Sequence, residues 1–270
     1  MIADSAGDPW LSVISVVRND PEGFQSTLAS LQGQDLAGVE FVVVDSSDNP
    51  AEIPALLEFY PEASVNYYWV EPRGIYAAMN TGIDLAKGEY VFFANAGDTF
   101  FSDSVLASMK NLLIGADLVW VVGRVRIIET DGNEVTTSRL NFEAERDRLF
   151  ARGIFPPHQA TVVRTWELKS LGGFSEQFAI AADYHAALKL AKISTPVVVD
   201  NVFMTFREGG VSTQQWRESF REFHQARLDV FAPSGMARLV ELFDTYRHYA
   251  TVWLHRNVMS GFTRRREDRV

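Results

Sequence analysis

Cysteine is absent from this sequence of 270 residues. Its absence excludes a disulfide framework, a thiolate metal site and a thiol nucleophile. Any bound metal must therefore be held by carboxylate, imidazole or amide groups. A chain without cysteine also fits the reducing cytoplasm, where we expect this protein to act.

Long apolar runs are missing too. None reaches the roughly 18 residues that a bilayer span needs. Residues 1–10 carry acidic side chains and no basic ones, unlike the start of a secretory signal. We expect neither a signal peptide nor a span, and a location in the cytoplasm or peripherally at the inner face of the cell membrane.

Basic residues are outnumbered: 25 Lys and Arg stand against 35 Asp and Glu, giving a formal net charge of −10. This balance argues against a nucleic-acid partner, because phosphate neutralisation requires clustered cations. The charge is uneven. Residues 1–213 hold 15 basic and 28 acidic residues, whereas residues 214–270 hold 10 and 7, so the two segments are expected to face different surroundings.

Four short apolar runs alternate with helical patterns in the first half of the chain, which predicts an α/β fold. The expected strands are Leu11–Val17, Phe41–Val44, Val65–Val70 and Tyr90–Ala94. The expected helices begin at Asp20-Pro21 and cover Ile53–Phe59 and Ile75–Lys87, the last ending at Gly88. This order indicates a mostly parallel sheet with helices on both faces, whose ligands bind beyond the carboxyl ends of the strands.

The second half predicts a hairpin and further strands and helices. The expected strands are Leu118–Val122, Val125–Ile128, Val135–Thr137, Ala160–Arg164 and two short strands within Val197–Phe206 that are broken near Asp200-Asn201. The expected helices start near Thr165, cover Ala182–Lys192, run from a capping box at Ser212 and Gln215 to Phe231, and cover Met236–Val258. We therefore predict one catalytic domain, residues 1–213, and a helical extension, residues 214–270.

Three carboxylates could carry chemistry, and each has a plain structural alternative. Asp98 follows a buried strand and can hold a divalent cation against a diphosphate, or cap a turn. Asp45 ends the second strand and can bind a nucleoside, or form a turn. Asp183 opens a helix and can act as a general base, or serve as the helix N-cap.

Other candidates are weaker. His158 follows a Pro-Pro turn and can contact an acceptor, although a lone histidine near a core is more often structural. Arg207, Gly209 and Gly210 form a cationic loop that can close over phosphates, or an ordinary connection.

Several motifs, in order, resemble the family 2 glycosyltransferases of the GT-A fold. They are ISVVRND, FVVVDSSD, PRGIYAAMNTGIDLAKGEYVFFANAGDTF, HQATVVR, GGFSEQFAIAADYHAALKL and FREGGVST. The third is the most specific and resembles a bacterial polysaccharide-synthesis branch. The resemblance implies a GT-A-type, Rossmann-like mixed and mostly parallel sheet flanked by helices.

The resemblance also implies roles. Asp183 would be the catalytic base, and Asp98 the ligand of Mn²⁺ or Mg²⁺. Contacts to the donor are implied for Val16, Arg18, Asp45, Arg73, Tyr76, Asn80, Asn95, Ala96 and Arg207. Asn95 and Gly97 stand where many members have acids, and Ala77 replaces an Asp that is common in this branch.

The implied activity is inverting transfer of a sugar, with a UDP-sugar as the expected donor, to a glycan or lipid-linked acceptor in cell-surface polysaccharide or glycolipid synthesis. A catalytically degenerate sugar-binding or scaffold protein is the alternative. A sugar nucleotidyltransferase is disfavoured because VVRNDPEGFQ lacks a glycine-rich phosphate loop. In the C-terminal helices, Tyr246, Tyr249, Trp253, Phe262 and the basic run Arg264–Arg266 suggest a contact with anionic lipid. The alternative is a helix packed on the catalytic domain or on a dimer mate, with a solvated basic tail.

Overall fold

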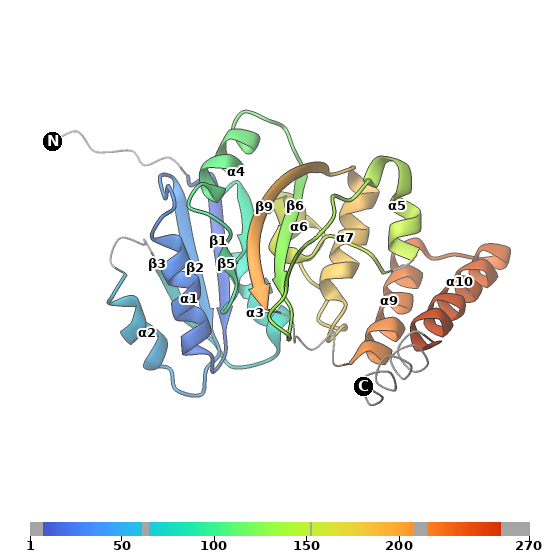
Figure 1. The fold of residues 1–270 in the computed structure, drawn as a ribbon, viewed down its shortest axis with the longest axis horizontal. Helices are drawn as coiled ribbons and strands as arrows, with labels where there is room; N and C mark the ends of the chain where they lie inside the picture. The colour runs from blue at the N-terminus through green and yellow to red at the C-terminus, as the bar shows by residue number, and fades with distance from the viewer. Residues whose placement is uncertain (1–7, 61–64, 152, 208–214, 255–270) are drawn as a thin grey trace, which may run out of the picture.

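The computed structural model describes residues 8–60, 65–151, 153–207 and 215–254. One nine-stranded sheet runs through the molecule, with helices on both faces (Figure 1). Its strands are β1 Leu11–Val17, β2 Val39–Asp45, β3 Val65–Trp69, β4 Tyr90–Phe93, β5 Thr99–Phe100, β6 Trp120–Ile128, β7 Glu134–Thr136, β8 Thr161–Arg164 and β9 Val197–Arg207. The order across the sheet is β3-β2-β1-β4-β8-β6-β9-β5, with β7 paired to β6.

The helices connect and cover these strands. They are α1 Pro21–Leu31, α2 Glu52–Leu57, α3 Ile75–Leu85, α4 Val105–Leu113, α5 Phe142–Ala151, α6 Thr165–Ser170, α7 Ala182–Ile193, α9 Trp216–Phe231 and α10 Gly235–Leu254, with a short 3-10 turn η1 at His158–Ala160. Asp20 caps α1 by accepting from the Gly23 N–H, and Pro21 is its first residue, as the sequence predicts.

The core has two parts, one on each face of the sheet. Alternation along β1 illustrates this, because Ile14 and Val16 belong to the cluster beneath α3 and α7, while Leu11, Val13 and Val17 belong to the cluster beneath α1 and α4. Such period-2 burial on both faces requires the continuous apolar strands from which the α/β class was predicted. The mixed α/β sheet is confirmed.

The strand directions decide where the site lies. Strands β3, β2, β1 and β4 are mutually parallel. Strand β8 is antiparallel to β4 and to β6, and β6 is parallel to β9. The ends of β1, β2, β3, β4, β6 and β9 and the start of β8 therefore meet at one edge of the sheet.

Two predicted breaks in the second half are wrong. The segments expected as Leu118–Val122 and Val125–Ile128 form one strand, β6, and Val197–Phe206 belongs to one strand, β9. The pairing nevertheless skips, since Val122 opposes Val198 and Arg124 opposes Val202. An irregularity at Asp200-Asn201 thus interrupts the register and not the strand.

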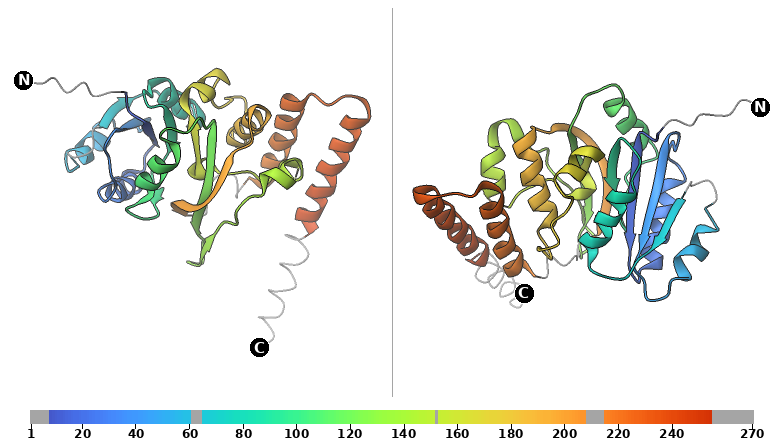
Figure 2. Two further views of the ribbon diagram at one scale, coloured as in Figure 1. Left: turned by 90° about the horizontal axis from the view of Figure 1, so that it is seen from above. Right: turned by 180° about the vertical axis from the view of Figure 1, so that it is seen from behind.

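Other boundaries also differ. Helix α3 ends at Leu85, and Gly88 approaches the backbone of Ser12, so its role is close packing and not helix termination. At α9 the N-cap is Gln215, with no side-chain hydrogen bond; Ser212 of the expected capping box lies outside the described residues. Helices α9 and α10 lie at the end of the molecule opposite β3 (Figure 2).

Candidate active site

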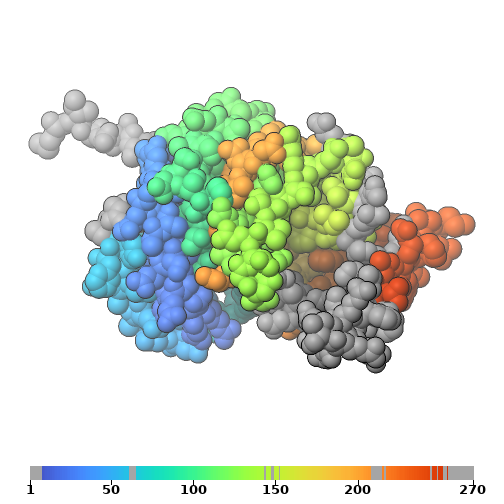
Figure 3. Space-filling model, viewed as in Figure 1, coloured from blue at the N-terminus to red at the C-terminus, as the bar shows by residue number. Residues whose placement is uncertain are grey.

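The edge where these strands meet holds most of the predicted site residues. Arg18 follows β1, Asp45 ends β2, Arg73 precedes α3, Asn95 follows β4 and Arg207 ends β9. The parallel order brings these positions together although they span 190 residues of sequence. The space-filling view shows the light-green segment that contains β6 and β7 at the middle of the visible face (Figure 3).

Asp45 is fully buried at the end of β2. One carboxylate oxygen accepts from the Ser47 N–H at 2.8 Å, and the other accepts from the Tyr67 hydroxyl at 2.9 Å. Burial, with this hydrogen bond and the charge of Asp45, raises the pKa of Tyr67. Asp45 therefore fixes the Ser46-Ser47 turn, with spare lone pairs for further donors. Tyr67 was not identified from the sequence.

The turn after β4 places Asn95 and Asp98 beside the end of β1. The Asn95 side-chain oxygen accepts from the Val16 N–H at 3.3 Å, and the Ala96 N–H donates to the Val16 carbonyl at 3.2 Å. Gly97 has a φ of +89°, a conformation that favours glycine. This explains why an acidic residue at position 97 would be strained here.

Asp98 is a buried carboxylate, 6% exposed. It accepts from the Asn95 N–H at 3.1 Å and from the Gln159 side chain at 3.5 Å. Burial raises the pKa of Asp98 to about 6, opposed by His158, Gln159 and Asn95. A desolvated carboxylate of this kind gains from a nearby cation.

The residues around Asp98 fit a divalent cation whose remaining coordination positions are filled by substrate phosphates and water. Within the described ranges, no group of three or more His, Asp or Glu side chains forms a metal cluster. One carboxylate with substrate phosphates and waters is nevertheless a usual environment for Mg²⁺. Asp98 supplies the carboxylate, and its burial raises its pKa.

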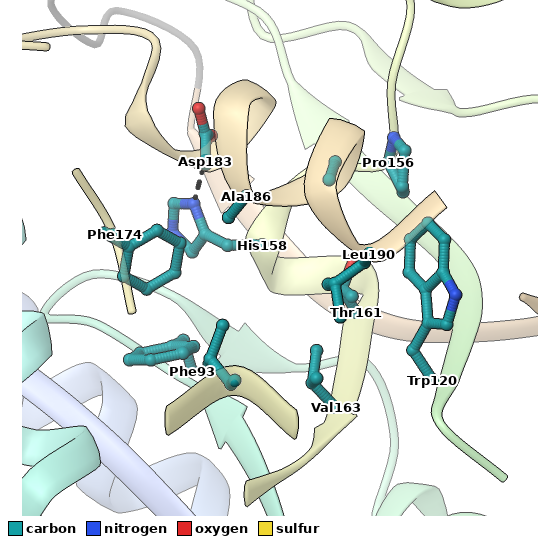
Figure 4. Close-up of a pocket in the computed structure, with 12 residues that line it drawn as sticks. Phe93, Trp120, Pro156, His158, Thr161, Val163, Phe174, Asp183, Ala186 and Leu190 are labelled. Carbon is teal, nitrogen blue, oxygen red and sulfur yellow. Dashed lines mark ion pairs between the residues drawn. The ribbon is translucent and has the colours of Figure 1, made fainter. Parts of the chain in front are cut away.

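His158 lies between this turn and Asp183. Because β8 runs antiparallel to β4, with Phe92 opposite Val162, η1 reaches the end of β4. The His158 Nε2 lies 3.2 Å from the Asn95 amide nitrogen, and Nδ1 lies 3.6 Å from an Asp183 oxygen. Figure 4 shows the His158 imidazole beside Asp183, with its nitrogen directed at the carboxylate.

Asp183 lies in the first turn of α7 but does not cap it, because the N-cap is Ala181. The Asp183 side chain is 16% exposed. It accepts from the Tyr184 N–H at 2.7 Å and lies 3.4 Å from the Tyr76 hydroxyl. The alternative of Asp183 as N-cap is therefore wrong, and its second oxygen faces only His158 among the described residues.

Glu222 caps the turn that leads into α7, and this role was missed in the sequence. This α9 residue is 5% exposed, and its carboxylate accepts from the N–H groups of Ala179, Ile180 and Ala181 at 2.8–3.0 Å. Backbone donors at a helix start favour an anion. No local pattern signals this contact, because donor and acceptor are 41–43 residues apart.

Tyr76 and Asn80 project from α3 toward the second half of the chain. The Tyr76 hydroxyl donates to the Ile180 carbonyl at 2.7 Å, and burial raises the pKa of Tyr76. Asn80 donates to the Phe174 carbonyl and accepts from the Phe174 N–H, both at 2.8 Å. Asn80 thus holds the 172–174 turn, and both atoms of its amide group are already used.

The remaining candidates lie on the surface or outside the described residues. Arg18, Arg73 and Arg207 are exposed, and in the part of the chain that the structure describes each has no ion-pair partner. Gly209 and Gly210 lie outside that part. The predicted boundary at residues 213 and 214 also lies there, while α9 beyond it contributes Ala226 and Val230 to the core.

A mostly apolar pocket lies behind the His158–Asp183 pair. The lining includes Phe93 on β4, Trp120 on β6, Val163 on β8, Leu190 on α7 and Phe174 between α6 and α7 (Figure 4). This apolar lining keeps His158 and Asp183 poorly hydrated on that side, which strengthens their electrostatic interaction.

Comparisons with known proteins agree with this architecture. A family model described as glycosyl transferase family 2 matches residues 12–166, more than half of the chain. An uncharacterised glycosyltransferase of Mycobacterium tuberculosis is 29% identical over 214 residues, covering 77% of this chain and 78% of that protein. A PGL/p-HBAD biosynthesis glycosyltransferase of the same species is 26% identical over 200 residues, covering 71% and 72%.

Solved structures share the fold. S. aureus TarS 1–349 in complex with UDP-GlcNAc matches with a TM-score of 0.63 and 19% identity, over 81% of this chain and 66% of that one. This chain spans 39% of a longer TarS chain. The mannosyltransferase PcManGT from Pyrobaculum calidifontis, in complex with GDP-Man and Mn²⁺, matches with a TM-score of 0.63 and 18% identity, over 93% and 76%. With the family model, the edge site and the shared fold, this chain belongs to glycosyl transferase family 2 and is a glycosyltransferase with a GT-A fold.

Proposed function

We propose that this glycosyltransferase transfers a sugar from a UDP-sugar to a hydroxyl group of a glycan or lipid-linked acceptor, with inversion, in cell-surface polysaccharide or glycolipid synthesis. The observation that carries the proposal is the meeting of Asp98 and Asp183 at one sheet edge, linked through Asn95 and His158. The PGL/p-HBAD relative supports the pathway class. The nucleotide sugars bound by TarS and PcManGT support the donor class.

The donor half of the site is the side with Asp45 and Asp98. Asp45 would orient the nucleoside, and the exposed Arg18, Arg73 and Arg207 would approach the diphosphate as cations at the same edge. Asp98 would hold Mn²⁺ or Mg²⁺. Such a cation, when bound, offsets the charge that develops on the leaving diphosphate.

The acceptor half is the side with Asp183. Its carboxylate removes the proton from an acceptor hydroxyl as that oxygen forms a bond to the anomeric carbon, and the bond from this carbon to the diphosphate breaks. Attack from the face opposite the nucleotide inverts the configuration. Glu222 holds the residues just ahead of α7, which would keep Asp183 in place for this step.

Calorimetric titration with UDP, GDP and dTDP, each with and without Mn²⁺, tests the donor half. We expect Mn²⁺-dependent binding of UDP that Asp98→Ala abolishes and that the control Asp103→Ala, at an exposed site, retains. Binding of GDP or dTDP alone would overturn the assignment to UDP. Binding of none of the three would favour the degenerate alternative.

Asp183→Asn tests the acceptor half. We expect it to bind the nucleotide as the unmodified chain does and to lose turnover by about 10²–10⁴-fold, the usual contribution of a general base. Asp84→Asn, an exposed change on α3, is the control. Normal turnover in Asp183→Asn would rule out this base.

We also propose that α10 lies on an anionic membrane surface. The polar side chains of this helix face the protein, and its apolar side chains face outward. Its polar Glu241 and Thr245 bind Arg227 and His224 of α9. Its apolar side chains point away and are 53–74% exposed, namely Met236, Leu239, Val240, Phe243, Tyr246 and Leu254.

Charge favours a membrane over a second copy. Residues 255–270, which directly follow α10 in the sequence, contain five arginines and two acidic residues, in a chain whose net charge is −10. Anionic headgroups attract such a segment, whereas two copies would repel each other there. No helix in the described ranges is long and apolar enough to cross a membrane.

Co-sedimentation with phosphatidylglycerol–phosphatidylcholine vesicles tests this contact. We expect binding that falls at least tenfold in Leu239→Ser/Phe243→Ser, since burial of either side chain contributes roughly 1.5–3 kcal/mol. Phe59→Ser, exposed elsewhere, is the control. If light scattering gave the molar mass of a dimer for the unmodified chain and of a monomer for the double variant, the exposed face would instead be a homodimer interface.

A further inference from the structure

The Asn95 side chain has one possible orientation. Its oxygen lies 3.3 Å from the Val16 backbone nitrogen, and a backbone N–H can only donate. The Asn95 amide nitrogen must therefore point the other way, toward His158. This contact identifies which end of the Asn95 amide group is the oxygen and which is the nitrogen.

The orientation of Asn95 then decides the protonation of His158. The amide nitrogen of Asn95 lies 3.2 Å from His158 Nε2. An amide NH₂ group only donates, so Nε2 must offer its lone pair. The ring proton of neutral His158 consequently resides on Nδ1, although free imidazole side chains favour Nε2.

The Nδ1–H group faces Asp183. Nδ1 is buried without a hydrogen-bond partner in the described structure, and an Asp183 oxygen lies 3.6 Å away. The two side chains are 17% and 16% exposed. An approach of a few tenths of an ångström would turn this contact into a hydrogen bond. Phe93 holds the ring edge-on with centroids 6.4 Å apart.

We propose that Asn95 and His158 are a matched pair of positioning residues, in which Asn95 fixes the Nδ1–H tautomer of His158 and this N–H orients the Asp183 carboxylate. The proposal rests on the proposed role of Asp183 as the base. It assigns a function to Asn95, which replaces an acidic residue that is common in the family. An aspartate there would attract a proton to Nε2 and leave either a lone pair facing Asp183 or a charged imidazolium.

The tautomer can be measured without knowing the donor or acceptor. We expect long-range ¹H–¹⁵N spectra of the ¹⁵N-histidine-labelled chain to show a protonated Nδ1 and an unprotonated Nε2 for His158, assigned by loss of the signal in His158→Asn. We expect Asn95→Asp to move the proton to Nε2 or to protonate both nitrogens. A protonated Nε2 in the unmodified chain would overturn the proposal.

Two substitutions of His158, to Asn and to Gln, test whether the Nδ1–H group orients Asp183 for catalysis. The amide nitrogen of Asn can occupy the position of Nδ1, and that of Gln the position of Nε2. With the donor and acceptor that support turnover, we expect His158→Gln to lower kcat about 10- to 100-fold, as loss of an orienting partner commonly does. His158→Asn should keep most of kcat, and KM for the donor should change little in both variants. His224→Gln is the control, at a part-buried histidine between α9 and α10.

Non-additivity separates positioning from general damage. Asn95→Asp should lower kcat in the unmodified background and have little effect in the His158→Asn background, where no tautomer remains to be fixed. Equal kcat in His158→Asn and His158→Gln would refute the positioning role. If Asp183→Asn kept normal turnover while the tautomer was as expected, the proposed base would fail and the hydrogen-bond arrangement would stand.

Discussion

At the scale of the residue, Asp98 links function to a cost in stability. Burial raises its pKa from 3.8 to about 6, so the Asp98 carboxyl group binds a proton more tightly in the folded state than in the unfolded state. Between pH 3.8 and 6 the folded state binds more protons than the unfolded state, and stability therefore falls as pH rises through this window. The difference at neutral pH is about 3 kcal/mol.

Asp98→Asn should therefore stabilise the metal-free chain at pH 8 by about 2–3 kcal/mol and have little effect near pH 4. Urea unfolding at both pH values, in the presence of a chelator, measures this. Asp103→Asn, at an exposed position, should change neither value. A variant less stable at pH 8 than the unmodified chain would mean that hydrogen bonds to Asp98 outweigh its desolvation.

Gly88 is required because the backbone of β1 passes too close to it to leave room for a side chain. A Cβ at this position would lie 2.6 Å from the Leu11 carbonyl carbon and closer still to the Ser12 nitrogen. We expect Gly88→Ala to cost about 3 kcal/mol through overpacking. Gly132→Ala has open space but a φ of +87°, so it should cost only about 1 kcal/mol. Similar losses in the urea unfolding of both variants would contradict the steric explanation.

At the scale of the element, the start of α7 depends on α9. Glu222 accepts three backbone N–H groups ahead of Asp183. Glu222→Gln replaces one acceptor oxygen by a donor, which leaves at least one buried N–H unsatisfied at a cost of about 1–3 kcal/mol. We expect lower stability in urea unfolding and a kcat reduced together with it. Glu218→Gln, which affects only a surface pair with Arg221, is the control, and normal kcat in Glu222→Gln would show that the cap does not position Asp183.

The sequence predicts elements best where local pattern and tertiary pairing agree. Strands β1, β2 and β4 are continuous apolar runs, and their predicted positions are confirmed to within two residues. The breaks predicted inside β6 and β9 fail because Gly123 and Asp200-Asn201 disturb the pattern while pairing between the two strands continues. Local periodicity cannot detect a neighbour that keeps a strand extended.

At the scale of the whole molecule, the order of the motifs indicated the family. The sheet topology explains which residues meet in the site. Asp45, Asp98 and Asp183 could be named from the sequence because Asp45 ends a strand, Asp98 lies in the turn after a buried strand and Asp183 lies in the first turn of a helix. The Asn95–His158–Asp183 contacts could not, since they depend on the antiparallel placement of β8 beside β4. Glu222 could not be identified for the same reason, since its contact joins α9 to residues 41–43 positions earlier in the chain.

The same contacts predict which part of the C-terminal segment the enzyme needs. Helix α9 supplies Glu222 to the start of α7, Asp229 to His185 and Arg227 to Tyr184, whereas α10 contacts α9 and α5. A chain of residues 1–233 should unfold cooperatively, bind the same nucleotide as the full chain, and lose roughly 1–3 kcal/mol because Arg227 loses Glu241 and Thr245. A chain of residues 1–213 leaves the α7 cap and the adjoining core open, and we expect it to lack a cooperative transition. Nucleotide titration and urea unfolding of the three chains measure this, and a 1–213 chain that binds and unfolds like the full one would place the domain boundary before α9.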